Sequence, residues 1–153
     1  MINFTLSLNS KNKKIFYILC GFCFVAVVYI ITNLMMSTQN GKTNEDRIRF
    51  INALEVSVVT VPSEVKTVKI PYEFDDVYIN YNNIQKAAGY DLFSFRGKEV
   101  VLYTYALKDK DFVADVHLIV FKGEIIGGDI CGRAFGSQML PLSKDSAKFF
   151  KKE

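Results

Sequence analysis

The chain has 153 residues, of which 50% are hydrophobic and 23% are charged, and its formal net charge is +3 at pH 7. Non-specific nucleic-acid binding depends on clustered positive charge that neutralises phosphates. Here 16 basic and 16 acidic residues lie beyond the N-terminal segment, so the remaining chain is neutral and nucleic acid is not expected as a partner. The whole excess comes from three N-terminal lysines, Lys11, Lys13 and Lys14.

An uncharged apolar run comes directly after these lysines, from Ile15 to Met36. At about 1.5 Å per residue a helix of this length reaches about 33 Å, enough to cross a hydrocarbon core of about 30 Å. A helix also satisfies its own backbone hydrogen bonds in lipid. We therefore predict a transmembrane helix over residues 15–36, with the lipid bilayer as its partner.

Basic residues beside a first span tend to remain in the cytoplasm. We therefore expect a single-pass protein of the cell membrane with a cytoplasmic tail (residues 1–14), a short linker (37–42) and an extracytoplasmic domain. A cleaved signal peptide is the alternative. Against it, the run is longer than the usual apolar core of about 7–15 residues, and residues 34–37 lack an A-x-A-like cleavage site.

The external domain is predicted to span residues 43–143, with a basic tail over 144–153. A capping box over residues 43–46 predicts a first helix at about 44–54. Two short strands should come after it, over the β-branched runs 56–61 and 65–70, each closed by a proline.

The clearest helix comes next and should end at Gly89, a left-handed C-cap. Its apolar residues recur at helical spacing, which predicts a face packed on the core: Phe74, Val77, Tyr78, Tyr81, Ile84 and Ala88.

Three further strands with short connections are expected over residues 99–107, 113–121 and 124–130, the last two joined by a tight hairpin. Residues 132–142 are expected to be irregular and 144–152 to form a short terminal helix. The order α-β-β-α-β-β-β predicts an α+β fold, with the main helix packed on an antiparallel sheet.

Cys131 is a candidate thiol nucleophile, because His117, the single histidine, and Asp129 lie on neighbouring predicted strands. A two-residue turn at Lys122 and Gly123 points Cys131 and His117 to opposite faces. A three-residue turn puts them on one face, but about 13 Å apart. Neither register lets the imidazole act as a base for the sulfur, so only a large bulge would restore this pair.

Other chemistry finds little support in the sequence. One histidine with scattered carboxylates lacks the spacing of zinc or calcium sites, and we expect no cofactor. Gly127 and Gly128 lie at a hairpin rather than before a helix, so they indicate close backbone approach instead of a phosphate loop. Cys20 and Cys23 lie within the predicted span, where a redox or metal role is disfavoured.

Several segments together resemble the bacterial domain-of-unknown-function family 4830, a membrane-anchored extracytoplasmic domain seen mainly in Firmicutes. The resemblance covers about residues 45–133. It implies a location and a domain type, and it brings no activity or catalytic residues. The residues that carry it are Ile70 to Tyr78, Tyr81 and Asn82, Gln85 and Lys86, Gly89 to Leu92, Gly97 and Lys98, Tyr103 to Tyr105, and Ile126 to Cys131.

From these observations we expect a non-catalytic external domain that binds an envelope protein or polymer. The alternative is a small envelope enzyme, a hydrolase or a thiol enzyme, with its site near Asp129 and Cys131. A purely structural or homodimeric role is a third hypothesis. In each case the segment containing Gly127, Gly128, Asp129 and Cys131 is the first place to look for a site.

Overall fold

A computed structural model of the chain describes residues 17, 19–29, 39–108, 113–134 and 136–149. It divides the chain into two compact units, Met1–Thr38 and Gln39–Glu153. In the first unit, residues 17 and 19–29 are helical and exposed. Among the described residues, no helix has both the length and the apolar character needed to cross a membrane. The predicted span over residues 15–36 lies partly outside the described residues.

The second unit is built on one five-stranded antiparallel sheet in which each strand pairs with the next along the chain. This confirms the α+β class and the antiparallel sheet. The strands are β1 (Glu64–Lys69), β2 (Glu99–Ala106), β3 (Ala114–Phe121), β4 (Glu124–Gly132) and β5 (Met139–Pro141). The helices are α2 (Asn44–Ala53), α3 (Asp76–Ala87), the short 3-10 helix η1 (Leu92–Phe95) and α4 (Lys144–Phe149).

The predicted order of elements is wrong at two points. The run at residues 56–61 is not a strand, because Val58 makes only an isolated bridge to Leu107 while Val56 and Val58 turn into the core. In contrast, β5 lies in the segment expected to be irregular, and three residues ending at Pro141 are too short for a period to be recognised.

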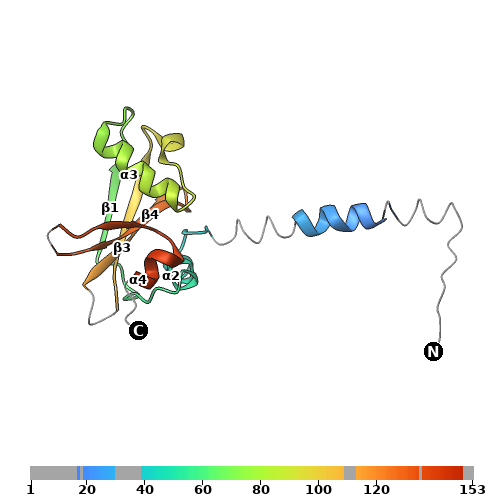
Figure 1. Cartoon of the computed structure of the whole chain (residues 1–153), viewed down its shortest axis with the longest axis horizontal. Helices are drawn as coiled ribbons and strands as arrows, with labels where there is room; N and C mark the ends of the chain where they lie inside the picture. Colours follow the sequence, from blue (N-terminus) through green and yellow to red (C-terminus); the bar gives the residue numbers. More distant parts are fainter. Residues whose placement is uncertain (1–16, 18, 30–38, 109–112, 135, 150–153) are drawn as a thin grey trace, which may run out of the picture. The chain divides into compact units, whose positions relative to one another are not determined.

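Apolar side chains form a core on each face of the sheet, so both faces are covered. On the α2 face, Phe50 and Ile51 of the helix pack with Val116 and Leu118 of β3. On the other face, Leu92 of η1 and aromatic side chains of α3 pack over the sheet. Figure 1 shows α3 and η1 near one end of the strands and α2 and α4 near the other.

Both predicted helix signals at the ends of α2 and α3 are present. Thr43 caps α2 through a capping box with Asp46, and the two side chains satisfy each other's backbone N–H groups. Gly89 lies just beyond α3 with φ of +86°, the left-handed conformation that glycine adopts without a steric penalty. Residues 39–42, part of the predicted linker, belong to the folded unit, since the Gly41 N–H donates to the carbonyl of Gly123 at 2.9 Å.

The predicted apolar face of α3 is only partly correct. Val77 is 75% exposed, and the buried residues of this helix are Asn82 and Gln85. Asn82 accepts a hydrogen bond from the Leu92 N–H at 2.8 Å and donates to Asp91 at 2.9 Å. The helix is therefore fixed to η1 and β4 by buried amides as well as by apolar contacts.

Candidate functional site

A β-bulge in the β3–β4 hairpin decides which residues of the candidate region meet. The turn has the predicted two residues, because Phe121 pairs with Glu124, and Lys122 and Gly123 both have positive φ. The register then shifts between Ile119 and Val120, which moves the rest of the ladder by one residue. Both registers considered from the sequence are therefore wrong beyond the bulge.

After this shift His117 lies directly opposite Asp129, and the two side chains form a hydrogen bond. The Nδ1 atom of His117 lies 2.8 Å from Oδ1 of Asp129, and the Tyr81 hydroxyl donates to Oδ2 at 3.0 Å. Asp129 is 2% exposed, whereas the His117 side chain is 24% exposed. A buried carboxylate thus connects β3 and β4 to helix α3 and leaves the imidazole partly open to solvent.

The electrostatics of this group result from its burial. Burial alone lowers the pKa of His117, but the hydrogen bond and negative charge of Asp129, with smaller effects of Asp115 and Glu64, raise that pKa overall. Burial and the Asp129 charge also raise the pKa of Tyr81, so its hydroxyl stays protonated and remains a donor.

A buried hydroxyl extends this polar row across the sheet. Thr104 of β2 pairs with His117 on one side and with Glu64 of β1 on the other. The Thr104 residue is 6% exposed, and its Oγ1 atom has no hydrogen-bond partner among the described residues. The row therefore reaches from Glu64 on the edge strand to Asp129, and it contains one imidazole, that of His117.

The thiol of Cys131 lies on this same face but is not activated. Cys131 pairs with Asp115, two residues along the ladder from His117, and the thiol donates to the Gly132 carbonyl at 3.5 Å. Burial, and to a smaller extent the charges of Asp129 and Asp115, raises the pKa of the Cys131 thiol, which disfavours the nucleophilic thiolate. No hydrogen bond joins this sulfur to the imidazole within the described part of the chain.

Gly127 and Gly128 are required for packing. A Cβ atom on Gly128 would overlap the backbone carbonyl oxygen of His117, and one on Gly127 would lie 2.7 Å from Oε1 of Gln85. That same Gln85 oxygen accepts the Gly128 N–H at 2.7 Å. Gly127 thus lets α3 approach β4 closely, and Gly128 lets β4 approach the backbone of β3, which is the close backbone approach expected from the sequence.

No group of three or more histidine, cysteine or carboxylate side chains able to hold a metal ion occurs among the residues that the structure describes.

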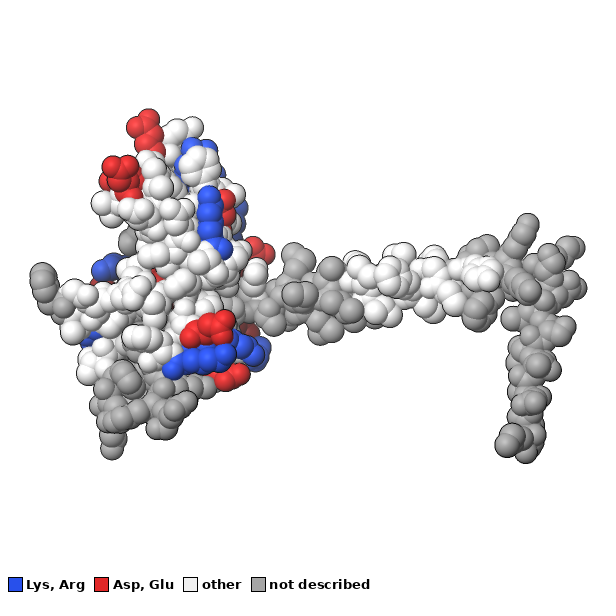
Figure 2. Space-filling view, viewed as in Figure 1, with Lys and Arg blue, Asp and Glu red and all other residues white. Residues whose placement is uncertain are grey.

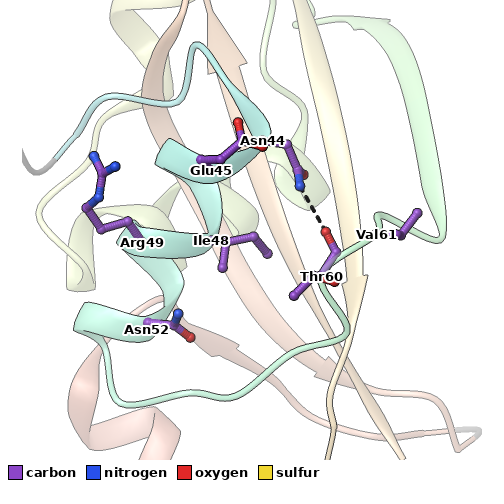
Figure 3. A pocket seen from close by; sticks show the side chains of 7 residues that line it. All are labelled: Asn44, Glu45, Ile48, Arg49, Asn52, Thr60 and Val61. Carbon is purple, nitrogen blue, oxygen red and sulfur yellow. Dashed lines mark hydrogen bonds between the residues drawn. The ribbon is translucent and has the colours of Figure 1, made fainter.

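A separate open pocket lies beside α2, far along the sequence from Asp129, and has a cavity volume of about 570 Å³. Figure 3 shows α2 on one side and residues 60 and 61 on the other, joined by a hydrogen bond from Asn44 Nδ2 to the Thr60 carbonyl at 2.9 Å. The sequence offered no signal for this site, because its walls meet only through the tertiary fold. Its lining residues are Asn44, Glu45, Ile48, Arg49, Asn52, Thr60 and Val61.

Buried polar groups support the wall formed by α2. Arg47 is 6% exposed and donates through Nε to the Tyr105 hydroxyl at 2.8 Å and through a terminal nitrogen to the Gly41 carbonyl at 2.8 Å. The Tyr105 hydroxyl in turn donates to Asn44 Oδ1 at 3.0 Å. This chain of bonds orients the Asn44 amide toward Thr60, so the pocket is formed before any ligand binds.

No protein-family model, curated protein or solved structure matches this chain.

Proposed function

We propose that this chain is a single-pass membrane protein whose domain over residues 43–143 lies outside the cytoplasm and binds an envelope protein or polymer without catalysis. The run at residues 15–36 is uncharged, and the charged side chains before it are all basic, which supports the anchor and its orientation. The resemblance to family 4830 agrees with this location and remains a prediction.

The observation that carries a binding role is the pocket beside α2. Its volume lies within the range of about 300–1,000 Å³ that is usual for ligand sites. Ile48 and Val61 offer apolar surface, and Glu45 and Arg49 supply one charge of each sign. Such a mixture suits a partner with apolar and polar groups side by side, such as a protein segment or a substituted polymer. Figure 2 shows basic and acidic side chains interspersed on the visible face of this unit.

Location is tested by treating intact cells that carry a C-terminal epitope with an external protease. The proposal expects the protein in the membrane fraction and its epitope lost from intact cells. Release of the full-length chain into the soluble fraction, or an epitope that is protected until the cells are broken, would contradict the anchor or its orientation.

Binding is tested with the full-length chain in detergent, presented with purified cell-wall polymer and with solubilised envelope proteins. Ile48→Trp should fill the pocket and abolish retention of the bound component. Val113→Trp, at a residue that is 63% exposed and does not line the pocket, is the matched control. Equal retention by the two variants, or no retention by the wild type, would count against this pocket as the binding site.

A small envelope enzyme is the second candidate, favoured by the bond between His117 and Asp129. A carboxylate that orients the Nδ1 atom of an imidazole leaves Nε2 as a base, and the bulge puts Cys131 on the same face. Rapid labelling of Cys131 by an electrophilic thiol probe at neutral pH, lost in His117→Gln, would support this candidate. Slow labelling that is unchanged in His117→Gln would exclude thiol catalysis.

A further inference from the structure

Strand β1 forms an exposed edge of the sheet. It pairs with β2 on one side, and no other strand among the described residues pairs with its outer side. Five of its six residues are exposed, and Val65 is 52% exposed. The opposite edge of the sheet, formed by β5, is less exposed and shorter, because its three residues are half-buried and the strand ends at Pro141. An exposed edge without proline is a template for pairing with another strand.

The outward-facing backbone groups of β1 are determined by its pairing with β2. The Ile70 N–H donates to the Lys98 carbonyl at 3.0 Å, and the ladder continues in the same register to Glu64. In an antiparallel ladder, alternate residues direct both backbone groups to the same neighbour. The N–H and C=O groups of Val65, Thr67 and Lys69 therefore point away from β2, toward the free edge.

We propose that a second copy of this chain pairs with β1 in an antiparallel manner about a two-fold axis at Thr67, which joins two sheets into one. A two-fold axis normal to the sheet leaves every side chain on the same face of the joined sheet. Because directly opposite residues of an antiparallel pair share a face, the axis must pass between one residue and the same residue of the other copy. With Thr67 at the axis, Val65 lies opposite Lys69 of the partner subunit. All the outward-facing groups of the three residues are then paired.

Side-chain complementarity selects this register. Thr67 faces its own copy, a favourable cross-strand pair, and the Lys66 stem covers the half-buried Val68 of the partner subunit. An axis at Lys66 would place two ammonium groups opposite each other. An axis at Val65 would need the Ser63 N–H, which is already bonded to the Thr104 carbonyl at 2.8 Å.

The same complementarity favours a second copy over an unrelated peptide as the occupant. In the Thr67 register the strand meets no like charge directly opposite: Glu64 faces Ile70, Lys66 faces Val68 and Lys69 faces Val65 of the other copy. Two copies of β1 are therefore sufficient for this pairing, and no other strand is required.

The proposal is tested by disulfide cross-linking of the full-length chain in membranes, with its native cysteines replaced by serine. Thr67→Cys should cross-link at least about tenfold faster than Lys66→Cys. Paired Cα atoms lie about 5.5 Å apart, within disulfide range, whereas the diagonal Lys66 pair lies about 7–8 Å apart. Val65→Cys is the second control. Faster cross-linking at residue 65 or 66, or none at any position, would overturn the proposal.

A proline variant separates pairing from folding. The Thr67 N–H points away from β2, so Thr67→Pro removes no bond within one subunit. In a chain carrying both Val65→Cys and Lys69→Cys, which should cross-link to each other between copies, Thr67→Pro should abolish the dimer band and leave the melting temperature nearly unchanged. A folded proline variant that still cross-links would refute edge pairing.

Discussion

His117 and Asp129 lie directly opposite each other on β3 and β4, with Nδ1 and Oδ1 2.8 Å apart, because a bulge shifts the hairpin by one residue. Without the extra residue Ile126 in β4, Asp129 would point to the face of the sheet opposite the imidazole. The relationship makes a buried carboxylate the link between the sheet and Tyr81 of α3. Its consequences for stability can be measured.

Stability should depend on the ionisation of His117. The pKa of His117 is raised in the folded state, so its contribution is fully present below the unfolded pKa of about 6.5 and is lost as pH rises through the folded pKa. Thermal unfolding of the wild type and His117→Gln, measured at about pH 6 and about pH 9, should show a larger wild-type advantage at the lower pH. An advantage that grows with pH would contradict this assignment.

Removing the Tyr81 hydroxyl should leave the buried Asp129 carboxylate with one donor fewer. We expect Tyr81→Phe to lower the free energy of unfolding by about 1–3 kcal/mol, the usual cost of an unsatisfied buried polar group. Denaturant titration measures this change. Tyr72→Phe, at a residue that is 73% exposed, is the matched control and should be close to neutral. Equal effects of the two changes would argue that the Tyr81 bond adds nothing.

The two glycines of β4 should differ in their tolerance of alanine. At Gly128 the new Cβ meets the His117 backbone carbonyl, which is held in the ladder, so Gly128→Ala should cost about 2–3 kcal/mol. At Gly127 the nearest atom is Oε1 of the Gln85 side chain at 2.7 Å rather than a backbone atom, so Gly127→Ala should cost less, about 1 kcal/mol. Unfolding by urea tests this order, and a reversed order would contradict the packing described.

Arg47 should matter far more than its neighbour Arg49. Arg47 is buried, donates to Gly41 and Tyr105, and its guanidinium carbon lies 3.6 Å from the centroid of the Tyr103 ring. Arg47→Leu leaves two buried acceptors without their donor and should cost about 2–3 kcal/mol. Arg49→Leu, whose side chain is 77% exposed, should leave the melting temperature close to that of the wild type. Calorimetry of both variants distinguishes the two arginines.

Local signals in the sequence were sufficient for much of the fold. The capping box at Thr43 and Asp46, the helix end at Gly89 and the turn at Lys122 and Gly123 each depend on residues close together in the chain. Alternation and spacing then predicted the α+β class. The run at residues 56–61 misled the prediction, since Val56 and Val58 are buried from a loop rather than from a strand, and Val59 and Val61 are exposed.

The candidate site was predicted only in part. The sequence pointed to the segment of Asp129 and Cys131, and the structure places His117 and Tyr81 on that carboxylate. The pocket beside α2 carried no local signal, because Asn44 and Thr60 lie 16 residues apart and Tyr105, whose hydroxyl orients the Asn44 amide, comes from a distant strand.

The sequence by itself determined the apolar N-terminal run, the neutral charge of the remaining chain, and the types of most elements, because periodicity and capping act within a few residues. Only the tertiary structure decided which side chains meet. One extra residue between Ile125 and Gly127 reverses the faces of the ladder beyond it, and no local pattern announces such a shift. The same long-range packing buried the amides of Asn82 and Gln85 in the α3 interface, beside the aromatic side chains that were expected there.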